Sequence, residues 1–433
     1  MANNECMLAE FNLFGNIPVQ HQVEKCFYQE FTPISLINDK SPITIVANGT
    51  PNQCWALHKS YLTVTCKIIK GDGTPVGAAG EVAPCNNVLD SMFQQIDVEL
   101  GDKQVSDNNN MYMYRAYMVN TLSYSEEAQK TWMRGVGYVK DTATKFNVVE
   151  RAAATNLGVK ERGTLFDGST EVQLSGRPHC DIFMQDRAIL PNSKLTMKLI
   201  PSRDNFVLLC PAAGNATAYK LKIIDVRLSL CILQISDSLN LAVHKMLQTT
   251  NARYPLTRVT MKHLSIPAQS TNVLQDNLYL GKIPKRVILG LVTDASMGGG
   301  YQLNPFEFAH NGLNYLALNV NGEMVPSKPL TPDFANGKYL REYTMMFEGM
   351  RNQFSNTPIN ISYSEFGNGF AFYVFDLTAH GHGGCMSSSQ NGTIRIEAKF
   401  AAATGAVINI ICLAEYDSEF EIDKYNQVLA VDY

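Results

Sequence analysis

Two histidines one residue apart form the strongest pattern for chemistry in the chain. His380 and His382 stand in the segment TAHGHGGCMSS, and Cys385 follows them. On a strand, such a pair places both imidazoles on one side, and Cys385 is near enough to add a thiolate ligand. A jelly-roll oxygenase would use similar histidine spacing, with a carboxylate shortly after the pair. The carboxylate that should follow shortly is missing, because the next acidic residue is Glu397. The glycines and serines around the pair favour a loop, so we predict neither a metal nor a cofactor.

Other patterns for catalysis are weaker. The glycines at 298–300 are not followed by the Lys-Ser/Thr pair of a phosphate loop, and no G-x-S-x-G nucleophile elbow is present. Glu126 and Glu127 resemble the solvated start of a helix more than an acid/base pair. We therefore predict that the protein is not an enzyme. A metal-dependent jelly-roll enzyme that uses His380 and His382 is the alternative, and elemental analysis would distinguish the two.

The charge balance argues against a nucleic-acid-binding role. The 433 residues include 36 Lys and Arg against 40 Asp and Glu, which gives a net charge of -4. Such a chain has no global positive field to attract nucleic acid or an anionic membrane. We therefore predict no direct sequence-specific binding of nucleic acid. No run approaches the ~18 apolar residues that cross a bilayer, so no membrane span is expected.

The ten cysteines are scattered and form no C-x-x-C pair. The first thirty residues lack a charged region followed by an apolar one, which predicts synthesis in the cytoplasm and reduced thiols. Cys66 and Cys412 stand within apolar, strand-like runs. We expect such cysteines to be small buried hydrophobic residues.

Alternating or continuous apolar runs, bounded by Gly, Pro, Asn and Asp, recur along the chain and predict many strands and few helices. The predicted strands of the first half are 42–48, 61–69, 95–100, 103–106, 171–176, 180–184, 194–200 and 219–235. Those of the second half are 258–267, 285–292, 315–320, 369–377, 392–402 and 406–416.

Each half also contains one predicted helix with an apolar stripe. We expect this stripe to bury one helix face against a sheet. The stripe residues are Met111, Tyr114, Met118 and Leu122 in the first half, and Tyr339, Tyr343, Met346, Phe347 and Met350 in the second. A further short helix is expected at the start of the segment 236–258, before a turn that contains proline.

The two halves repeat one plan. Gly101 lies in a predicted hairpin turn, and Gly322 lies in a similar phrase 221 residues later. Arg115 and Arg341, in the two predicted helices, are 226 residues apart. The nearly constant offset indicates an internal duplication, in which each half holds about eight strands and one inserted helix.

Strand pairs support the same alignment. The predicted strand 61–69 aligns with 285–292, and 194–200 aligns with 392–400. A unit of about eight strands is the size of one jelly roll, in which two antiparallel sheets close over a core. The predicted fold is therefore all-β, with two consecutive eight-stranded jelly-roll barrels and short inserted helices. The predicted division is an N-terminal arm at 1–35, a first jelly roll at 36–236 and a second at 237–433.

Several phrases, taken together and in order, resemble one known family. The chain is similar over most of its length to the double jelly-roll major capsid proteins of adintoviruses and Polinton (Maverick) elements, in the adenovirus-hexon-like lineage. The phrases that carry the resemblance are LFGNIPVQHQVEKCFYQEFTPISLINDKSPI (13–43), APCNNVLDSMFQQIDVELGDKQV (83–105), YRAYMVNTLSY (114–124), GRPHCDIFMQDRAIL (176–190), DNLYLGKIPKRVILGLV (276–292), NPFEF (304–308), VPSKPLTPDF (325–334), FDLTA (375–379) and GTIRIEAKF (392–400).

The resemblance implies a viral structural protein. Three chains would form a homotrimer that presents six jelly rolls as a pseudo-hexagonal capsomer, and capsomers would tile an icosahedral shell around a DNA genome. The implied partners are neighbouring capsomers, a single jelly-roll penton protein at the fivefold vertices, and minor capsid or cement proteins. The implied location is the virion, after synthesis in the host cytoplasm and assembly in the nucleus.

The resemblance also directs attention to particular segments. Phe11, Leu13 and Phe14 would suit an N-terminal arm that lies under the capsomer and touches a neighbouring capsomer. The alternative for this segment is an ordinary strap across its own jelly roll. The loops expected on the outer side of the shell are 125–170, 296–313 and 349–368.

A binding module is the second alternative to a capsid protein. A β-sandwich that binds a ligand or a carbohydrate would normally present exposed tryptophan platforms. The chain has only two tryptophans, Trp55 and Trp132.

Overall fold

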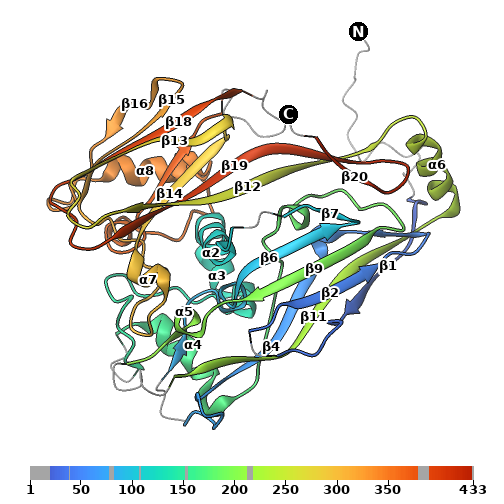
Figure 1. Ribbon diagram of the computed structural model, residues 1–433, viewed down its shortest axis with the longest axis horizontal. Helices are drawn as coiled ribbons and strands as arrows, with labels where there is room; N and C mark the ends of the chain where they lie inside the picture. Colours follow the sequence, from blue (N-terminus) through green and yellow to red (C-terminus); the bar gives the residue numbers. More distant parts are fainter. Residues whose placement is uncertain are drawn as a thin grey trace, which may run out of the picture.

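The computed structural model describes residues 20–38, 40–77, 82–106, 109–151, 155–211, 218–378 and 390–431. Strands dominate it, and they form four large sheets and one two-stranded ribbon (Figure 1). Two sheets belong to the first half of the chain and two to the second. The chain is therefore a β protein with short inserted helices, as predicted.

The first half of the chain builds two mostly antiparallel sheets. Their strands are β1 (Val23–Phe31), β11 (Lys220–Ile235), β4 (Tyr61–Ile69) and β8 (Val172–Gly176) in one sheet, with β3 (Gln53–Trp55) also paired to β11, and β2 (Ile43–Asn48), β9 (Lys194–Pro201), β6 (Phe93–Leu100) and β7 (Lys103–Gln104) in the other. The short strands β5 (Ala83–Pro84) and β10 (Leu208–Leu209) form the ribbon.

The second half of the chain builds two further sheets. Their strands are β12 (Ala252–Ile266), β19 (Ile408–Ile422), β14 (Arg286–Thr293) and β17 (Phe372–Asp376) in one sheet, with β20 (Val428–Val431) also paired to β19, and β13 (Asn272–Lys282), β18 (Asn391–Phe400), β15 (Leu313–Val320) and β16 (Glu323–Leu330) in the other.

The two halves have the same strand order. The eight main strands of the first half, numbered in chain order, are β1, β2, β4, β6, β7, β8, β9 and β11, and those of the second half are β12 to β19. In both halves one sheet has the order 1-8-3-6 and the other has the order 2-7-4-5. This is the order of a jelly roll. The prediction of two consecutive jelly rolls is therefore confirmed.

The predicted alignment of the halves is also correct. β4 and β14 are both third strands, and β9 and β18 are both seventh strands. Gly101 and Gly322 both lie in the turn between the fourth and fifth strands, where their φ angles of 66° and 90° favour glycine. The repeated phrase in the sequence is one structural hairpin built twice.

Two segments of the first jelly roll have another structure than the sequence predicts. Residues 180–184, predicted as a strand, contain a short 3-10 helix, Asp181–Phe183; a short apolar run does not by itself distinguish a strand from a buried turn. Residues 23–31, within the range predicted as an arm, form β1, which pairs along its length with β11. In β1 only every fourth side chain is half-buried, so the strand lacks the alternation by which strands are recognised.

Short helices fill the connections between strands. They are α1 (Val88–Ser91), α2 (Tyr112–Ser123), α3 (Glu126–Lys130), α4 (Leu157–Leu165), α5 (Asp204–Val207), α6 (Asp237–Leu247), α7 (Asp294–Gly298), α8 (Leu340–Gly349) and α9 (Tyr363–Phe366). α6 is the helix expected between the two halves, and the hydroxyl of Ser236 accepts a hydrogen bond from the amide of Leu239 at its start. Pro255, expected in a turn, lies instead within the edge strand β12.

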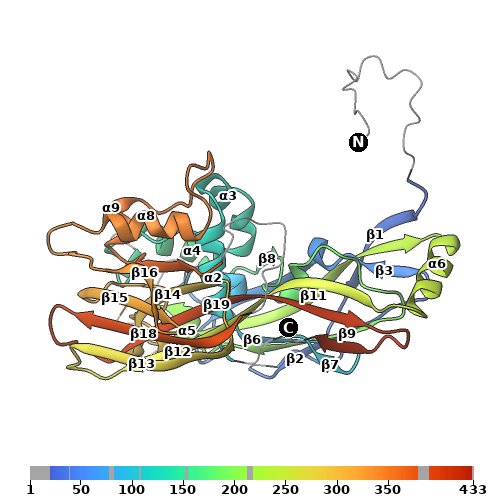
Figure 2. The same ribbon diagram turned by 90° about the horizontal axis from the view of Figure 1, so that it is seen from above.

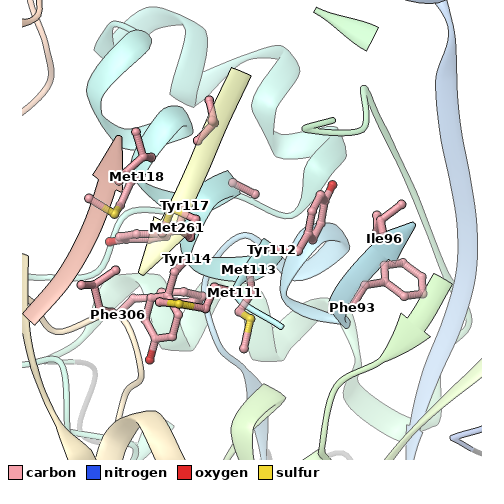
Figure 3. Close-up of a cluster of buried hydrophobic side chains, with 14 of the residues drawn as sticks. Phe93, Ile96, Met111, Tyr112, Met113, Tyr114, Tyr117, Met118, Met261 and Phe306 are labelled. Carbon is pink, nitrogen blue, oxygen red and sulfur yellow. The ribbon is translucent and has the colours of Figure 1, made fainter. Parts of the chain in front are cut away.

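α2 and α8 each follow the fifth strand of their jelly roll, but their surroundings differ. The four predicted stripe residues of α2 are buried, and so are Met113 and Tyr117 on other sides of the helix. The ring of Tyr117 stacks on Phe306 from the second half, with centroids 4.2 Å apart, and Met261 of β12 lies in the same cluster (Figure 3). The prediction of a single buried face is therefore incomplete for α2, because the helix is enclosed at the junction of the two jelly rolls.

Candidate functional site

The sequence offered one candidate metal site, and the structure describes only part of the chain that could hold one. Among the described residues, no group of three His, Cys, Asp or Glu side chains could hold a metal ion. His380, His382 and Cys385 lie outside the described residues, so the metal-site alternative stays a prediction. In the same described part, no helix is both long and apolar enough to cross a membrane.

The cysteines near the core behave as predicted. Cys66 and Cys412 are fully buried in β4 and β19. Burial raises the pKa of both thiols to about 12, so neither forms a thiolate at neutral pH. Their role is packing.

The three segments predicted as outer loops come together in space. The insertion 125–170 of the first jelly roll contacts both 296–313 and 349–368 of the second. The contacts include hydrogen bonds from the Thr144 amide to the Asn368 carbonyl (3.2 Å), from the Asn304 amide to Asn147 Oδ1 (2.7 Å) and from Asn360 Nδ2 to Gln129 Oε1 (2.8 Å). The insertions thus join the two jelly rolls.

A buried ion pair stabilises this junction. Arg162 and Asp141 are both fully buried, and their Nη2 and Oδ1 atoms are 2.8 Å apart. The other oxygen of Asp141 accepts a hydrogen bond from Asn304 Nδ2 at 3.1 Å, which connects the pair to the second half of the chain. Because the guanidinium also donates to the carbonyls of Pro84 and Val139, both charges have partners.

A second polar group lies beside α2. A cleft of about 340 Å³ separates Arg115 and Val119 of α2 from Thr257 and Val259 of β12. Arg115 forms a buried ion pair with Asp181, and burial raises the pKa of this carboxyl despite the attraction of the guanidinium. In this part of the structure, β12 and β14 of the second jelly roll cover the α2 face that carries Arg115.

Asp90 and His179 lie next to this ion pair, and both are fully buried. Tyr112 Oη donates a hydrogen bond to Asp90 Oδ1 at 2.7 Å, and His179 Nε2 is 3.7 Å from Asp90 Oδ2. Burial raises the pKa of Asp90 to about 7. Burial, with repulsion from Arg115, lowers the pKa of His179 to about 3, so the imidazole is neutral at pH 7. The group is enclosed, which favours a structural role.

The outer face of α8 borders an open groove of about 700 Å³. Its apolar lining includes Val325 and Pro326 of β16, Met345 of α8 and Val374 of β17. Leu340, at the start of α8, is 64 % exposed. An apolar groove with an exposed leucine at its edge is typical of a surface that binds protein.

A second exposed apolar surface lies on the first jelly roll. Tyr28 of β1 and Tyr61 of β4 are 51 % and 36 % exposed, and their ring centroids are 5.5 Å apart. We call this pair the tyrosine face. Exposed tyrosines are enriched at protein interfaces. This surface could not be predicted from the sequence, because the apolar pattern does not reveal which aromatic residues stay uncovered.

The predicted contact residues of the arm, Phe11, Leu13 and Phe14, lie outside the described residues. Their proposed role is therefore still a prediction. Trp132 is 53 % exposed and stands edge-on to Tyr124, whereas Trp55 is buried. The described tryptophans thus offer no pair of exposed platforms for a sugar.

Comparisons with known proteins bear on the fold. No protein-family model matches the chain. A curated relative, uncharacterized protein F54H12.2 of Caenorhabditis elegans, is 23 % identical over 403 residues, which are 89 % of this chain and 92 % of the relative. The similarity therefore spans both jelly rolls.

Solved structures of viral capsids are similar over nearly the whole chain. A chain of the Sputnik virophage has a TM-score of 0.65 and 13 % identity, and the match covers 100 % of this chain and 93 % of that one. A chain of the PBCV-1 virus capsid has a TM-score of 0.60 and 8 % identity, with 97 % and 100 % covered. The mavirus major capsid protein has a TM-score of 0.54 and 9 % identity, with 100 % and 96 % covered. The chain therefore shares the double jelly-roll fold of these capsid proteins.

Proposed function

We propose that this protein is a viral major capsid protein of the double jelly-roll type. The observation that carries the proposal is the pair of jelly rolls with one strand order, joined in a single chain that aligns almost end to end with capsid proteins. Fold alone does not determine function. An open apolar groove beside α8 is compatible with assembly through protein contacts.

The proposed assembly is a homotrimer. Three chains with two jelly rolls each would give six similar sides, and such a block tiles a hexagonal lattice around a DNA genome. The duplication lets each jelly roll diverge for its own contacts while the six-sided outline is kept. The proposed further partners are neighbouring capsomers, a single jelly-roll penton protein, and minor capsid or cement proteins.

The proposed lineage is that of adintoviruses and Polinton elements, on the phrases that resemble their capsid proteins. We also propose that Phe11, Leu13 and Phe14 belong to an arm that contacts a neighbouring capsomer. The proposed boundary between the first and the second jelly roll lies between residues 236 and 237. In this proposal the protein acts in the virion shell and is not an enzyme.

Size-exclusion chromatography with light scattering tests the proposal. We expect purified protein to give a mass near three times 48.0 kDa, the mass of one chain. The trimer should persist on dilution, because obligate interfaces bury more than about 2,000 Å². A stable monomer across a range of salt and protein concentrations would contradict the proposal.

A further inference from the structure

α2 and α8 are equivalent helices with different surroundings. The offset of 226 residues that relates Arg115 to Arg341 also relates Val119 to Met345. Arg115 and Val119 line the cleft beside α2, and Arg341 and Met345 line the groove beside α8. The same face of the repeated helix therefore borders both hollows.

The difference lies in what stands across each hollow. Thr257 and Val259 of β12 and Arg286 of β14 stand across the cleft from α2. Across the α8 groove the described chain offers only residues of β16 and β17, from the same jelly roll as α8. One helix is thus covered by a neighbouring jelly roll, and its counterpart is open.

The register of the second jelly roll fixes where its covering residues lie. Arg286, the first residue of β14, pairs with Glu415 of β19, and Glu415 also pairs with Val259 of β12. Thr257 lies two residues before Val259 on β12, and Lys285 Nζ donates a hydrogen bond to its hydroxyl at 2.9 Å. The covering surface is therefore formed by the first strand and the start of the third strand, which flank the eighth strand.

The corresponding positions in the first jelly roll follow from the same ladder. Tyr61, the first residue of β4, pairs with Ser229 of β11, and Ser229 also pairs with Glu30 of β1. Tyr28 lies two residues before Glu30. Tyr61 is thus the counterpart of Arg286, and Tyr28 is the counterpart of Thr257. The tyrosine face is the surface that would cover an equivalent helix.

The tyrosine face and the α8 groove cannot meet within one chain. In both views β1 lies toward one end of the long axis and α8 toward the other (Figures 1 and 2). Tyrosine is enriched among the residues that dominate the binding free energy of interfaces. Two exposed tyrosines therefore occupy the surface of the first jelly roll that corresponds to the covering surface of the second. This correspondence indicates that the α8 groove binds the tyrosine face of a second copy of the chain.

We propose that the α8 groove of one chain receives the tyrosine face of the next chain, in the arrangement in which β12 and β14 cover α2 within a chain. This inference rests on the proposed trimer and identifies its contact surfaces. The contact is heterologous, because two different surfaces meet. Three such contacts would close a ring of six jelly rolls. In this ring, the three junctions that lie within a chain alternate with the three contacts between chains.

Two double variants test the contact. The groove variant carries Leu340→Asp and Thr344→Asp, and the tyrosine-face variant carries Tyr28→Glu and Tyr61→Glu. All four side chains are exposed in the single chain, so the fold should be kept. In a homotrimer of either variant every contact has one altered side, and we expect the trimer to dissociate at protein concentrations at least about tenfold higher than for the wild type. The matched controls are Leu280→Asp on β13 and Tyr425→Glu after β19, which are 69 % and 71 % exposed and should stay trimeric.

Mixing the two variants tests the direction of the contact. The tyrosine-face variant keeps an intact groove, and the groove variant keeps an intact tyrosine face. An equal mixture should therefore form one good contact and give a dimer near two times 48.0 kDa. A mixture that stays monomeric, or variants that remain as trimeric as the controls, would overturn the inference.

Cross-linking of the unaltered protein gives a second test that does not depend on the variants. Lys338 precedes α8, and Lys25 and Lys59 flank the tyrosine face; all three are exposed. A lysine-specific cross-linker should join Lys338 of one chain to Lys25 or Lys59 of another in the trimer. A trimer without these cross-links would refute the contact and leave the capsid proposal standing. A wild-type monomer would refute both.

Discussion

Asp90 and His179 are buried side by side, and burial moves their pKa values in opposite directions. The pKa of Asp90 rises from 3.8 to about 7, so the folded chain holds a proton that the unfolded chain has already released. The contribution of Asp90 to the free energy of unfolding therefore falls as the pH rises from about 4 to about 7. The pKa of His179 falls from 6.5 to about 3, so stability from His179 is lost as the pH falls below about 6.5. Between about pH 4 and 6.5 the two effects oppose each other.

Replacement of Asp90 by asparagine should reveal the pH dependence that His179 alone gives to the free energy of unfolding. Since the Asp90→Asn variant lacks the opposing carboxyl, its free energy of unfolding should rise with pH between about 4 and 6.5, by up to about 1.4 kcal/mol per pH unit. The slope of the wild type in this window should be lower than that of the variant, because the carboxyl of Asp90 opposes the histidine. Urea unfolding of both proteins at several pH values measures the slopes. Equal slopes in the two proteins would show that the carboxyl does not hold a proton in the folded state.

At the scale of elements, the helix after the fifth strand has a different environment in each jelly roll. α2 is enclosed at the junction, where its Arg115 pairs with buried Asp181. In α8 the equivalent Arg341 is exposed and donates to the carbonyls of Lys328 and Pro329. Sequence spacing relates the two arginines but does not reveal which of them is buried.

The variants Arg115→Leu and Arg341→Leu should therefore differ in stability. Loss of Arg115 leaves the Asp181 carboxylate buried without its partner, which should lower the free energy of unfolding by about 3 to 5 kcal/mol. Loss of Arg341 removes hydrogen bonds at the surface and should cost about 1 kcal/mol or less. Chemical denaturation measures both, with Arg341→Leu as the matched control. Similar losses for both variants would contradict the assigned burial of Arg115.

Much of the fold could be predicted from the sequence because most strands have one buried face. Apolar alternation identified β4 and β9, and the turn glycines aligned the two halves. Alternation failed for β1, whose exposed side chains include Tyr28. In the predicted stripe of α8, Tyr339 and Met346 are buried but the other three residues are only half-buried. α2 proved to be buried on other sides too, because the second jelly roll covers it.

The candidate contact surfaces were not predictable in the same way. The α8 groove is formed by β16, β17 and α8, which meet only when the second jelly roll closes. The tyrosine face joins two strands that are far apart in the sequence. Such surfaces depend on long-range pairing, and their significance depends on what the rest of the chain leaves uncovered. The pair His380 and His382 is the opposite case. Its spacing along the chain suggests a metal site, but the spacing does not show which other side chains would surround the metal.

At the scale of the molecule, the chain contains one jelly roll twice, and the junction between the two is built from insertions of both. This junction sets the angle between neighbouring jelly rolls. If the same angle recurs between chains, three copies close into a ring of six jelly rolls. In the proposed trimer, three chains would present six similar sides because each chain contains two similar jelly rolls.

Electron microscopy of the purified protein tests this claim most directly. We predict class averages of single particles with a six-sided outline, in which six densities of similar size surround the threefold axis. The predicted particle contains three chains, with its two kinds of jelly roll alternating around the rim. Particles that contain a single pair of jelly rolls, or rings with another number of chains, would contradict the account.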